Sequence, residues 1–451
     1  MGSALSKPIE GMTQVSNARE ARSRTTKQTL NIFLGVTALA IASTSISLAI
    51  NSNYGGHHDI YLMLGSFLSV LHEGIYVPSR FTGYPVAEIG IGASAWIGGS
   101  SLSNTLNYSL FLASVLAFPF CFDAKPTLTR YLAFTCMTLS STVLAFDNIM
   151  SIDYPWSTFF WIAACASLKQ FENRTIAIIP LALAIGSRPV FALFALAAIL
   201  LVDGKQSEMP RNLLTRLQER WVEMVTVTFT GCLFYLPAWL KHGFGLSWIS
   251  AVAPDNQGFT GLVARFTFKL IGSFGVFQSS ILLALGIYIC FCWLSKRKNK
   301  LKITGNDARF LLTISAINLI VFARMPVQLS YLQPLLYCVY YAISRLRDIK
   351  LAAIAVLLAG LNLLNWKYQP KIIKISYEST ELCSKTVARD AKLGLWIDEG
   401  RMDEFKRNSK KSQCYRGWFQ QIRQADYSSV IINGQPLNRA NARSQANNKK
   451  T

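Results

Sequence analysis

Charged side chains are scarce in this sequence. Only 15% of the 451 residues are charged, whereas 51% are hydrophobic, and the mean hydropathy is +0.29. A soluble chain of this length normally divides into two or three domains with a larger share of charge. Apolar runs instead recur throughout positions 30–366. The sequence therefore predicts an all-α polytopic membrane protein.

Acidic residues and metal-ligand clusters are also few. Asp and Glu number 24 against 45 Lys and Arg, which gives a formal net charge of +21. The basic residues lie between the apolar runs and in the two tails, without a basic groove interleaved with stacking aromatics, so we predict no nucleic-acid partner. The histidines show no metal-ligand spacing, and seven of the nine cysteines lie in apolar runs, where cysteine behaves as a small hydrophobic residue.

Nine apolar runs are candidate spans. They are Leu30–Ile50, Asn107–Phe122, Tyr131–Phe146, Tyr154–Leu168, Trp221–Leu240, Gln278–Leu294, Phe310–Phe322, Tyr331–Ile343 and Leu351–Asn365. Twenty-two basic residues gather in the tail 1–29 and in alternate connections, against six in the intervening connections. The positive-inside rule makes the first set cytoplasmic. The N-terminus is therefore predicted inside, and the long connection 51–106 is predicted outside.

A further apolar run, Thr175–Val202, is interrupted by GSRP at Gly186–Pro189. The loops on both sides of this run are basic, so the chain must enter the membrane and return. Thr175–Gly186 makes about 18 Å of helix, against a bilayer core of about 30 Å, which places Arg188 at membrane depth at the tip of a re-entrant hairpin. About 11 membrane segments result, in a domain over 30–366, and the region 367–451 lies outside with a disordered end. A single span through 175–202 is the alternative, and it would reverse the predicted side of the membrane for every later connection.

Chemically reactive side chains fall on the predicted outer face. They are His57, His58, Asp59, Arg80, Tyr84 and Glu88 in the first loop, Asp147 and Asp153 in the second, Arg188 at the hairpin tip, and Arg324 and Tyr331 in the last loop. Charge beside a bilayer is costly and marks function. Arginine binds phosphate, and a carboxylate acts as general base toward a hydroxyl. The run IYLMLGSFLSVLHEGIY after Asp59 predicts an amphipathic helix along the interface, followed by two proline-containing turns.

Five short segments occur in a characteristic order: HHDIY, GYPVAEI, FDNIMSIDYPW, LAIGSRPVFALFALAAILL and FARMPVQLSYLQPLL. This layout resembles the GT-C superfamily of polyprenyl-phosphate-sugar-dependent glycosyltransferases, which includes the protein mannosyltransferase and aminoarabinose transferase families. The likeness extends from Leu30 to Arg345. Many relatives carry an adjacent acidic pair in the first loop and a large outer domain, whereas Asp59 stands alone and the region 367–451 has only 85 residues.

The resemblance implies an inverting membrane glycosyltransferase. It would move a sugar from a polyprenyl-phosphate donor to an acceptor hydroxyl of a glycan, lipid or protein, on the outer face of a bacterial inner membrane. Asp59 would be the catalytic base, and Arg188 and Arg324 would bind the donor phosphate. The residues expected to position the acceptor are His58, Arg80, Tyr84, Glu88, Asp147 and Tyr331. No cofactor is implied; participation of a divalent cation stays open, because Asp59 and Asp147 could share one only if they are close.

Simpler roles exist for several of these residues. Asp59 could cap the interfacial helix, Arg80 could anchor the chain at the interface, and Arg324 could pair with an acid as a structural bridge. Glu88 could favour a helix N-terminus electrostatically. Two other functions also fit. A secondary transporter with a broken-helix site at Arg188 predicts an internal repeat, which the sequence lacks. A non-catalytic scaffold subunit predicts that Asp59 and Arg188 tolerate substitution.

Overall fold

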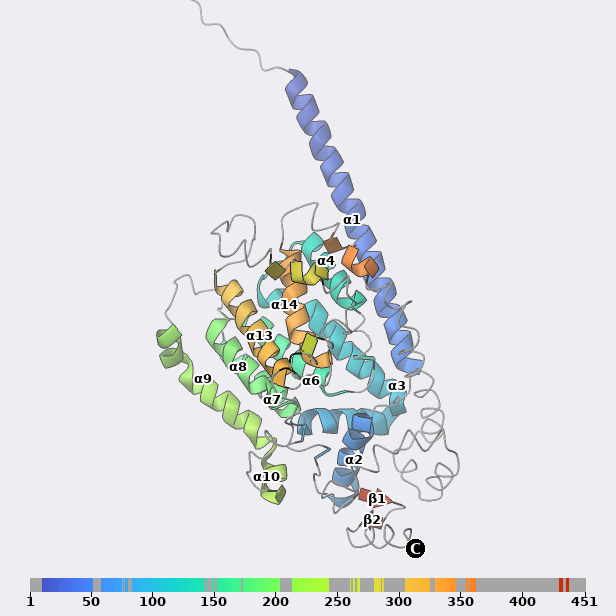
Figure 1. Cartoon of the computed structure of the whole chain (residues 1–451), viewed down its shortest axis with the longest axis vertical. Helices are drawn as coiled ribbons and strands as arrows, with labels where there is room; N and C mark the ends of the chain where they lie inside the picture. Colours follow the sequence, from blue (N-terminus) through green and yellow to red (C-terminus); the bar gives the residue numbers. More distant parts are fainter. Residues whose placement is uncertain are drawn as a thin grey trace, which may run out of the picture.

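The computed structural model describes residues 10–51, 58–74, 83–141, 152–171, 173–202, 213–242, 305–324 and 329–345, together with parts of 76–79, 144–149, 260–287, 354–361 and 430–437. Side chains are described from Thr25 onward, but those of His58, Asp59 and Arg324 lie outside the described part. The described chain is almost entirely helical, which confirms the predicted class at that coarse level (Figure 1).

Most described helices follow predicted apolar runs. The helices are α1 (Glu10–Asn51), α2 (His58–Glu73), α3 (Pro85–Ala117), α4 (Leu128–Ser140), α6 (Tyr154–Gln170), α7 (Ile178–Ser187), α8 (Phe191–Leu201), α9 (Leu213–Leu233), α10 (Leu236–His242), α13 (Gly305–Arg324) and α14 (Gln333–Ser344). Helix α4 ends at Ser140, before the end of the predicted run Tyr131–Phe146. The predicted runs Gln278–Leu294 and Leu351–Asn365 lie largely or partly outside the described residues. Short 3-10 turns are η1 (Phe118–Cys121), η2 (Arg174–Ala177) and η4 (Leu329–Leu332). Within the region 367–451, strands β1 (Val430–Ile432) and β2 (Gln435–Leu437) pair antiparallel, with Val430 opposite Leu437.

The central helix of the bundle is α6, which packs against α3, α7 and α8. Its Trp161 is fully buried, and the indole nitrogen donates a hydrogen bond of 3.2 Å to the carbonyl of Phe194 on α8. Phe118 in η1 and Phe194 approach the same indole with ring centroids 6.5 and 5.7 Å away. Aromatic packing of this kind fixes α6 and α8 relative to one another.

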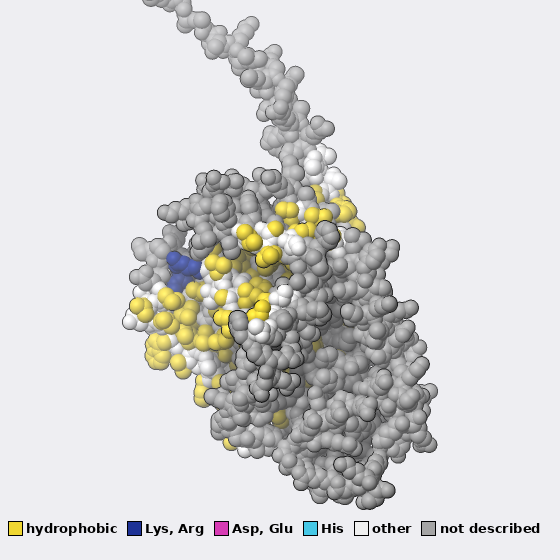
Figure 2. Space-filling view, in the orientation of Figure 1, with side chains coloured by type: hydrophobic (Ala, Val, Ile, Leu, Met, Phe, Trp, Pro, Cys, Tyr) yellow, Lys and Arg dark blue, Asp and Glu magenta, His cyan; other side chains and the backbone are white. Residues whose placement is uncertain are grey.

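Apolar side chains cover much of the described surface, while polar ones fill parts of the interior. Large exposed hydrophobic residues occur along α1 and α9, including Leu39 and Phe229, and Figure 2 shows apolar side chains in both places. Glu88, Asn107 and Asn318 are fully buried. This distribution is the one expected when lipid, rather than water, surrounds the helices.

Two described helices are long and apolar enough to cross a membrane, Thr25–Ile50 and Pro85–Cys121. The apolar helices at 174–187 and 191–201 are shorter. This result supports membrane association; the number of 11 segments stays a prediction.

Helix α3 contains a sharp elbow. Gly98 and Gly99 leave helical geometry, and Gly99 has φ +65°, a conformation that glycine adopts without steric cost. The half before the elbow lies across the lower end of the bundle in Figure 1, and the half after it runs up through the bundle. Pro85 starts the first half, where the missing N–H costs nothing. The connection 51–106, predicted to hold one amphipathic helix, therefore contains α2 and a second helical segment.

Helix ends that were predicted to lie on the same side of the membrane contact one another in the structure. At one end, Arg345 after α14 forms an ion pair with Asp123 after η1. At the other end, the Ser101 hydroxyl donates to the carbonyl of Ile50 at 2.9 Å, and the Tyr154 hydroxyl donates to the carbonyl of Tyr331 at 3.3 Å. The alternation of connections deduced from basic residues is therefore consistent with the packing of the described helices.

Candidate functional site

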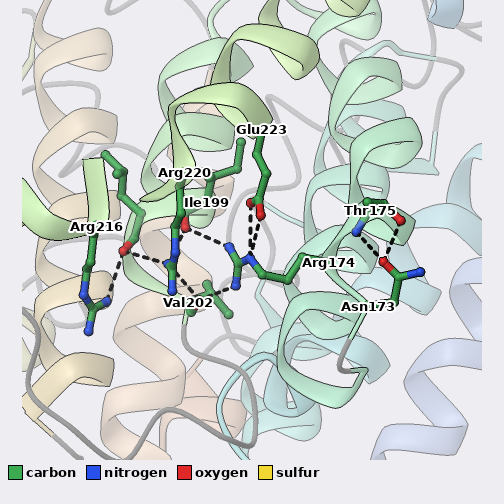
Figure 3. A network of polar contacts seen from close by, with 9 residues as sticks. Asn173, Arg174, Thr175, Ile199, Val202, Arg216, Arg220 and Glu223 are labelled. Carbon is green, nitrogen blue, oxygen red and sulfur yellow. Dashed lines mark hydrogen bonds and ion pairs between the residues drawn. The ribbon is translucent and has the colours of Figure 1, made fainter. Parts of the chain in front are cut away.

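The segment 174–202 forms a closed hairpin. Arg174, in η2 just before α7, donates hydrogen bonds to the carbonyls of Ile199 (2.9 Å) and Val202 (3.2 Å) at the end of α8. Figure 3 shows these bonds together with the ion pair between Arg174 and Glu223 of α9 (3.1 Å). The two ends of the segment therefore lie side by side, which excludes a single straight span through 175–202.

Two further arginines from α9 secure the same end of α8. Arg220 donates to the carbonyls of Ile199 (2.6 Å) and Leu200 (3.1 Å), and Arg216 donates to Leu200 (3.0 Å) (Figure 3). The last carbonyls of a helix have no partner within the helix and carry partial negative charge, so cations there are favourable. These arginines hold the open end of the hairpin by capping α8.

Arg188 lies at the closed end of the hairpin, between α7 and α8. Its backbone is extended, and its carbonyl accepts from the N–H of Phe191 at 3.0 Å, which turns the chain into α8. The side chain is 5% exposed and forms an ion pair of 2.9 Å with Asp153, whose side chain is 1% exposed. A buried arginine requires such a partner, because an unpaired charge away from water is very costly.

Tyrosine rings surround the Arg188 guanidinium. Its carbon lies 4.4 Å from the ring centroid of Tyr154, 4.7 Å from that of Tyr331 and 5.3 Å from that of Tyr84. These distances are within the range of favourable cation–π contact. Tyr84 immediately precedes α3, Tyr154 begins α6, and Tyr331 lies in η4. We call this arrangement of Arg188, Asp153 and the tyrosines 84, 154 and 331 the arginine cage.

Within the arginine cage, as far as the structure describes it, one donor group of Arg188 has no hydrogen-bond partner. The Nη1 nitrogen is buried, and no hydrogen-bond acceptor among the described residues reaches it. A buried donor without a partner costs free energy and calls for an explanation such as a ligand. An anionic oxygen is the natural partner for a guanidinium in this position.

Glu88 braces the loop that precedes α3. Its fully buried carboxylate accepts hydrogen bonds from the hydroxyls of Tyr76 and Ser79, and from the backbone N–H groups of Ser79 and Tyr84, both at 3.2 Å. Burial, and then the adjacent carboxylate, raise the pKa of the Tyr76 phenol well above its usual range, so it stays a protonated donor. Gly83 has φ +75°, and a Cβ there would meet the Tyr76 hydroxyl oxygen at 2.2 Å, so the turn requires glycine.

The structure brings several predicted site residues together. Arg188, Tyr84 and Tyr331 meet in the arginine cage, and Glu88 contacts the backbone of Tyr84. Asp59 is the second residue of α2 and Arg324 is the last residue of α13. The side chains of His58, Asp59 and Arg324 lie outside the described part, as do Arg80 and Asp147 entirely, so their roles stay predictions.

The sequence placed Asp153 on the outer face without a specific role, and it assigned no role to Tyr154, Tyr76 or Tyr235. Asp153 and Tyr154 adjoin the start of α6 in the segment DYPW, and nothing in this local pattern points to Arg188 as their partner. Tyr235, in the turn between α9 and α10, donates to the carbonyl of Ile185 at 2.5 Å and lies within electrostatic range of Tyr84, Glu88 and Arg188. Its place beside the arginine cage follows only from the packing of α9 on α7.

The chemistry available at the arginine cage is anion recognition. Among the described residues, no group of three His, Cys, Asp or Glu side chains could hold a metal ion. Comparisons with known protein families, with curated proteins and with solved structures find no match to this chain. The likeness to the GT-C superfamily therefore rests on the short sequence segments alone.

Proposed function

We propose that this chain is a membrane glycosyltransferase of the GT-C type, which transfers a sugar from a polyprenyl-phosphate donor to an acceptor hydroxyl. The observation that carries the proposal is the buried Arg188, whose Nη1 donor has no partner among the residues that the structure describes. This arginine lies at the tip of a hairpin, where Tyr84 from the connection between α2 and α3 contacts it. A guanidinium in a water-poor, aromatic setting is suited to the phosphate of a lipid donor.

In the proposed reaction, the acceptor oxygen forms a bond to the anomeric carbon as the bond from that carbon to the phosphate oxygen breaks. The acceptor proton passes to Asp59, and the lipid phosphate leaves with the electron pair. Configuration at the anomeric carbon is inverted. Phosphate is a good leaving group, so the step needs no second carboxylic acid to protonate it, in contrast to glycoside hydrolysis.

Asp153 and the tyrosines would act on Arg188 rather than on the substrate. The ion pair fixes the guanidinium plane, and the rings of Tyr84, Tyr154 and Tyr331 restrict it further. Nη1 is then left to meet a phosphate oxygen, with Arg324 as the second predicted ligand. Preorganised donors of this kind need no reorganisation when charge develops on the leaving group.

The location proposed for this activity is the outer face of a bacterial inner membrane, with the N-terminus in the cytoplasm. The apolar surface of α1 and α9 and the two long apolar helices support a membrane setting. The proposed partners are a lipid-linked sugar and a hydroxyl acceptor on a glycan, lipid or protein.

The test is sugar release from lipid carriers. Purified full-length protein in nanodiscs would be incubated with a panel of polyprenyl-phosphate sugars, and wild type compared with Asp59→Asn and Arg188→Lys. We expect one donor to turn over, Asp59→Asn to bind that donor without turnover, and Arg188→Lys to bind it weakly. The matched control is Asp307→Asn, in the first turn of α13, which should retain full turnover. Equal turnover by wild type and Asp59→Asn would exclude Asp59 as the base, and binding of no donor would exclude the proposed function.

The broken hairpin also suits a secondary transporter, whose sites lie where membrane helices are interrupted. Counterflow assays in liposomes separate the two functions. Uptake of a labelled anion without sugar transfer would support transport, whereas sugar transfer without uptake supports the glycosyltransferase.

A further inference from the structure

Two buried amide side chains lie beside the arginine cage and carry no charge. Asn318 on α13 and Gln333 at the start of α14 are both fully buried. The Asn318 amide nitrogen donates to the carbonyl of Tyr331 at 2.7 Å, and the Gln333 amide nitrogen lies 3.2 Å from the hydroxyl of Tyr337. Both amides therefore flank the same turn, 331–333, whose Tyr331 ring contacts Arg188.

Each of these amides leaves its oxygen unused. Asn318 Oδ1 and Gln333 Oε1 are buried, and neither accepts a hydrogen bond from any described residue. Burying an amide among apolar helices costs free energy unless its groups are satisfied, so each unpaired oxygen calls for a partner. Together with Arg188 Nη1, two acceptors and one donor near the turn 331–333 thus lack a hydrogen-bond partner in the described part of the chain.

The chemistry of these groups selects their partner. Amide oxygens accept from hydroxyls, and Nη1 donates to a phosphate oxygen, so a phosphate with neighbouring hydroxyl groups satisfies all three. A free carboxylate would favour an amino sugar. Among the described residues of the arginine cage the acid is Asp153, which is paired with Arg188, and the proposed role of Asp59 is to take the acceptor proton. We infer that Asn318 and Gln333 form a binding site for the hydroxyl groups of a neutral sugar, adjoining the phosphate position at Arg188. This inference rests on the proposed function and specifies the sugar class that the same site accepts.

The experiment measures binding by wild type, Asn318→Leu and Gln333→Met in nanodiscs. Each variant replaces the amide with an apolar side chain of similar size. The ligands are a polyprenyl phosphate carrying a neutral hexose, the same lipid carrying an amino sugar, the sugar-free polyprenyl phosphate and the free hexose. Thr135→Val is the matched control, because it removes another buried oxygen without a partner among the described residues, on α4.

We expect wild type to prefer the neutral-hexose lipid over the other two lipids. Each variant should lose about tenfold in affinity for the neutral-hexose lipid, while its affinity for the sugar-free lipid is unchanged. Thr135→Val should match wild type throughout.

If both variants keep the wild-type preference, or if wild type prefers the amino sugar, the inference is wrong and the proposed function stands. If wild type binds the free hexose but no lipid, and the variants lose the hexose, the sugar site stands and the proposed donor is wrong. If wild type binds none of the ligands, both proposals are wrong.

Discussion

Arg188 and Asp153 form an ion pair that solvent scarcely reaches, since their side chains are 5% and 1% exposed. Breaking a buried pair by neutralising one partner leaves an uncompensated charge in a medium that cannot solvate it. We predict that Asp153→Asn lowers the free energy of unfolding by about 3–5 kcal/mol. The double change Asp153→Leu with Arg188→Met should recover most of this loss, because it removes both charges.

Thermal unfolding in nanodiscs checks this prediction. Asp123→Asn provides the comparison, because the Asp123–Arg345 pair is considerably more exposed and should contribute no more than about 1 kcal/mol. A single variant Asp153→Asn that is as stable as wild type would contradict the assignment of a buried pair.

The hydrogen bonds of the Glu88 carboxylate stabilise the loop that precedes α3. This carboxylate holds Tyr76, Ser79 and Tyr84, so Glu88→Gln should destabilise the protein by about 1–3 kcal/mol, and Tyr76→Phe, which removes one of these bonds, by about 1 kcal/mol. Hydrogen exchange at the Tyr84 amide should increase in Glu88→Gln and change less in Tyr76→Phe. Unchanged exchange in both variants would show that the loop is held by other contacts.

At the scale of elements, the hairpin α7–α8 depends on how its open end is held. Arg220 is buried and caps α8 through two carbonyls, whereas the Arg174–Glu223 pair is partly exposed. We predict that Arg220→Met costs about 1–3 kcal/mol in the free energy of unfolding and that Glu223→Gln costs less than about 1 kcal/mol. Chemical denaturation of both variants and of wild type shows which variant loses more free energy of unfolding. The reverse order would assign the hairpin closure to the ion pair rather than to the cap.

Local composition predicted some elements well and others poorly. The interruption GSRP and the basic loops on either side were sufficient to predict the hairpin, because 12 residues cannot cross a bilayer. The elbow at Gly98–Gly99 was not predicted, since apolar and small residues continue through it and only the backbone conformation marks the break. The partners of Arg188 in the arginine cage lie between 34 and 143 positions from it along the chain, so they depend on packing that no local pattern contains.

At the scale of the whole molecule, the helix packing and the distribution of basic residues place the same helix ends together at each end of the bundle. We predict that single cysteines at Lys125, Lys169 and Leu214, in a chain whose nine native cysteines are replaced, react with an impermeant thiol reagent from one side of the membrane. Cysteines at Leu71 and Ser101 should react from the other side. Lys169 and Leu214 flank the hairpin, so labelling of these two from opposite sides would contradict the closed hairpin.

The arginine caps on α8 also have a consequence for biosynthesis. Helices α7 and α8 are each too short to cross a bilayer, and the arginines that cap α8 belong to α9, which emerges later from the ribosome. The hairpin therefore has no complete set of partners when it first leaves the translocation channel. We expect it to wait at the channel or the interface until α9 has been made, and then to insert together with α9 as a single three-helix unit.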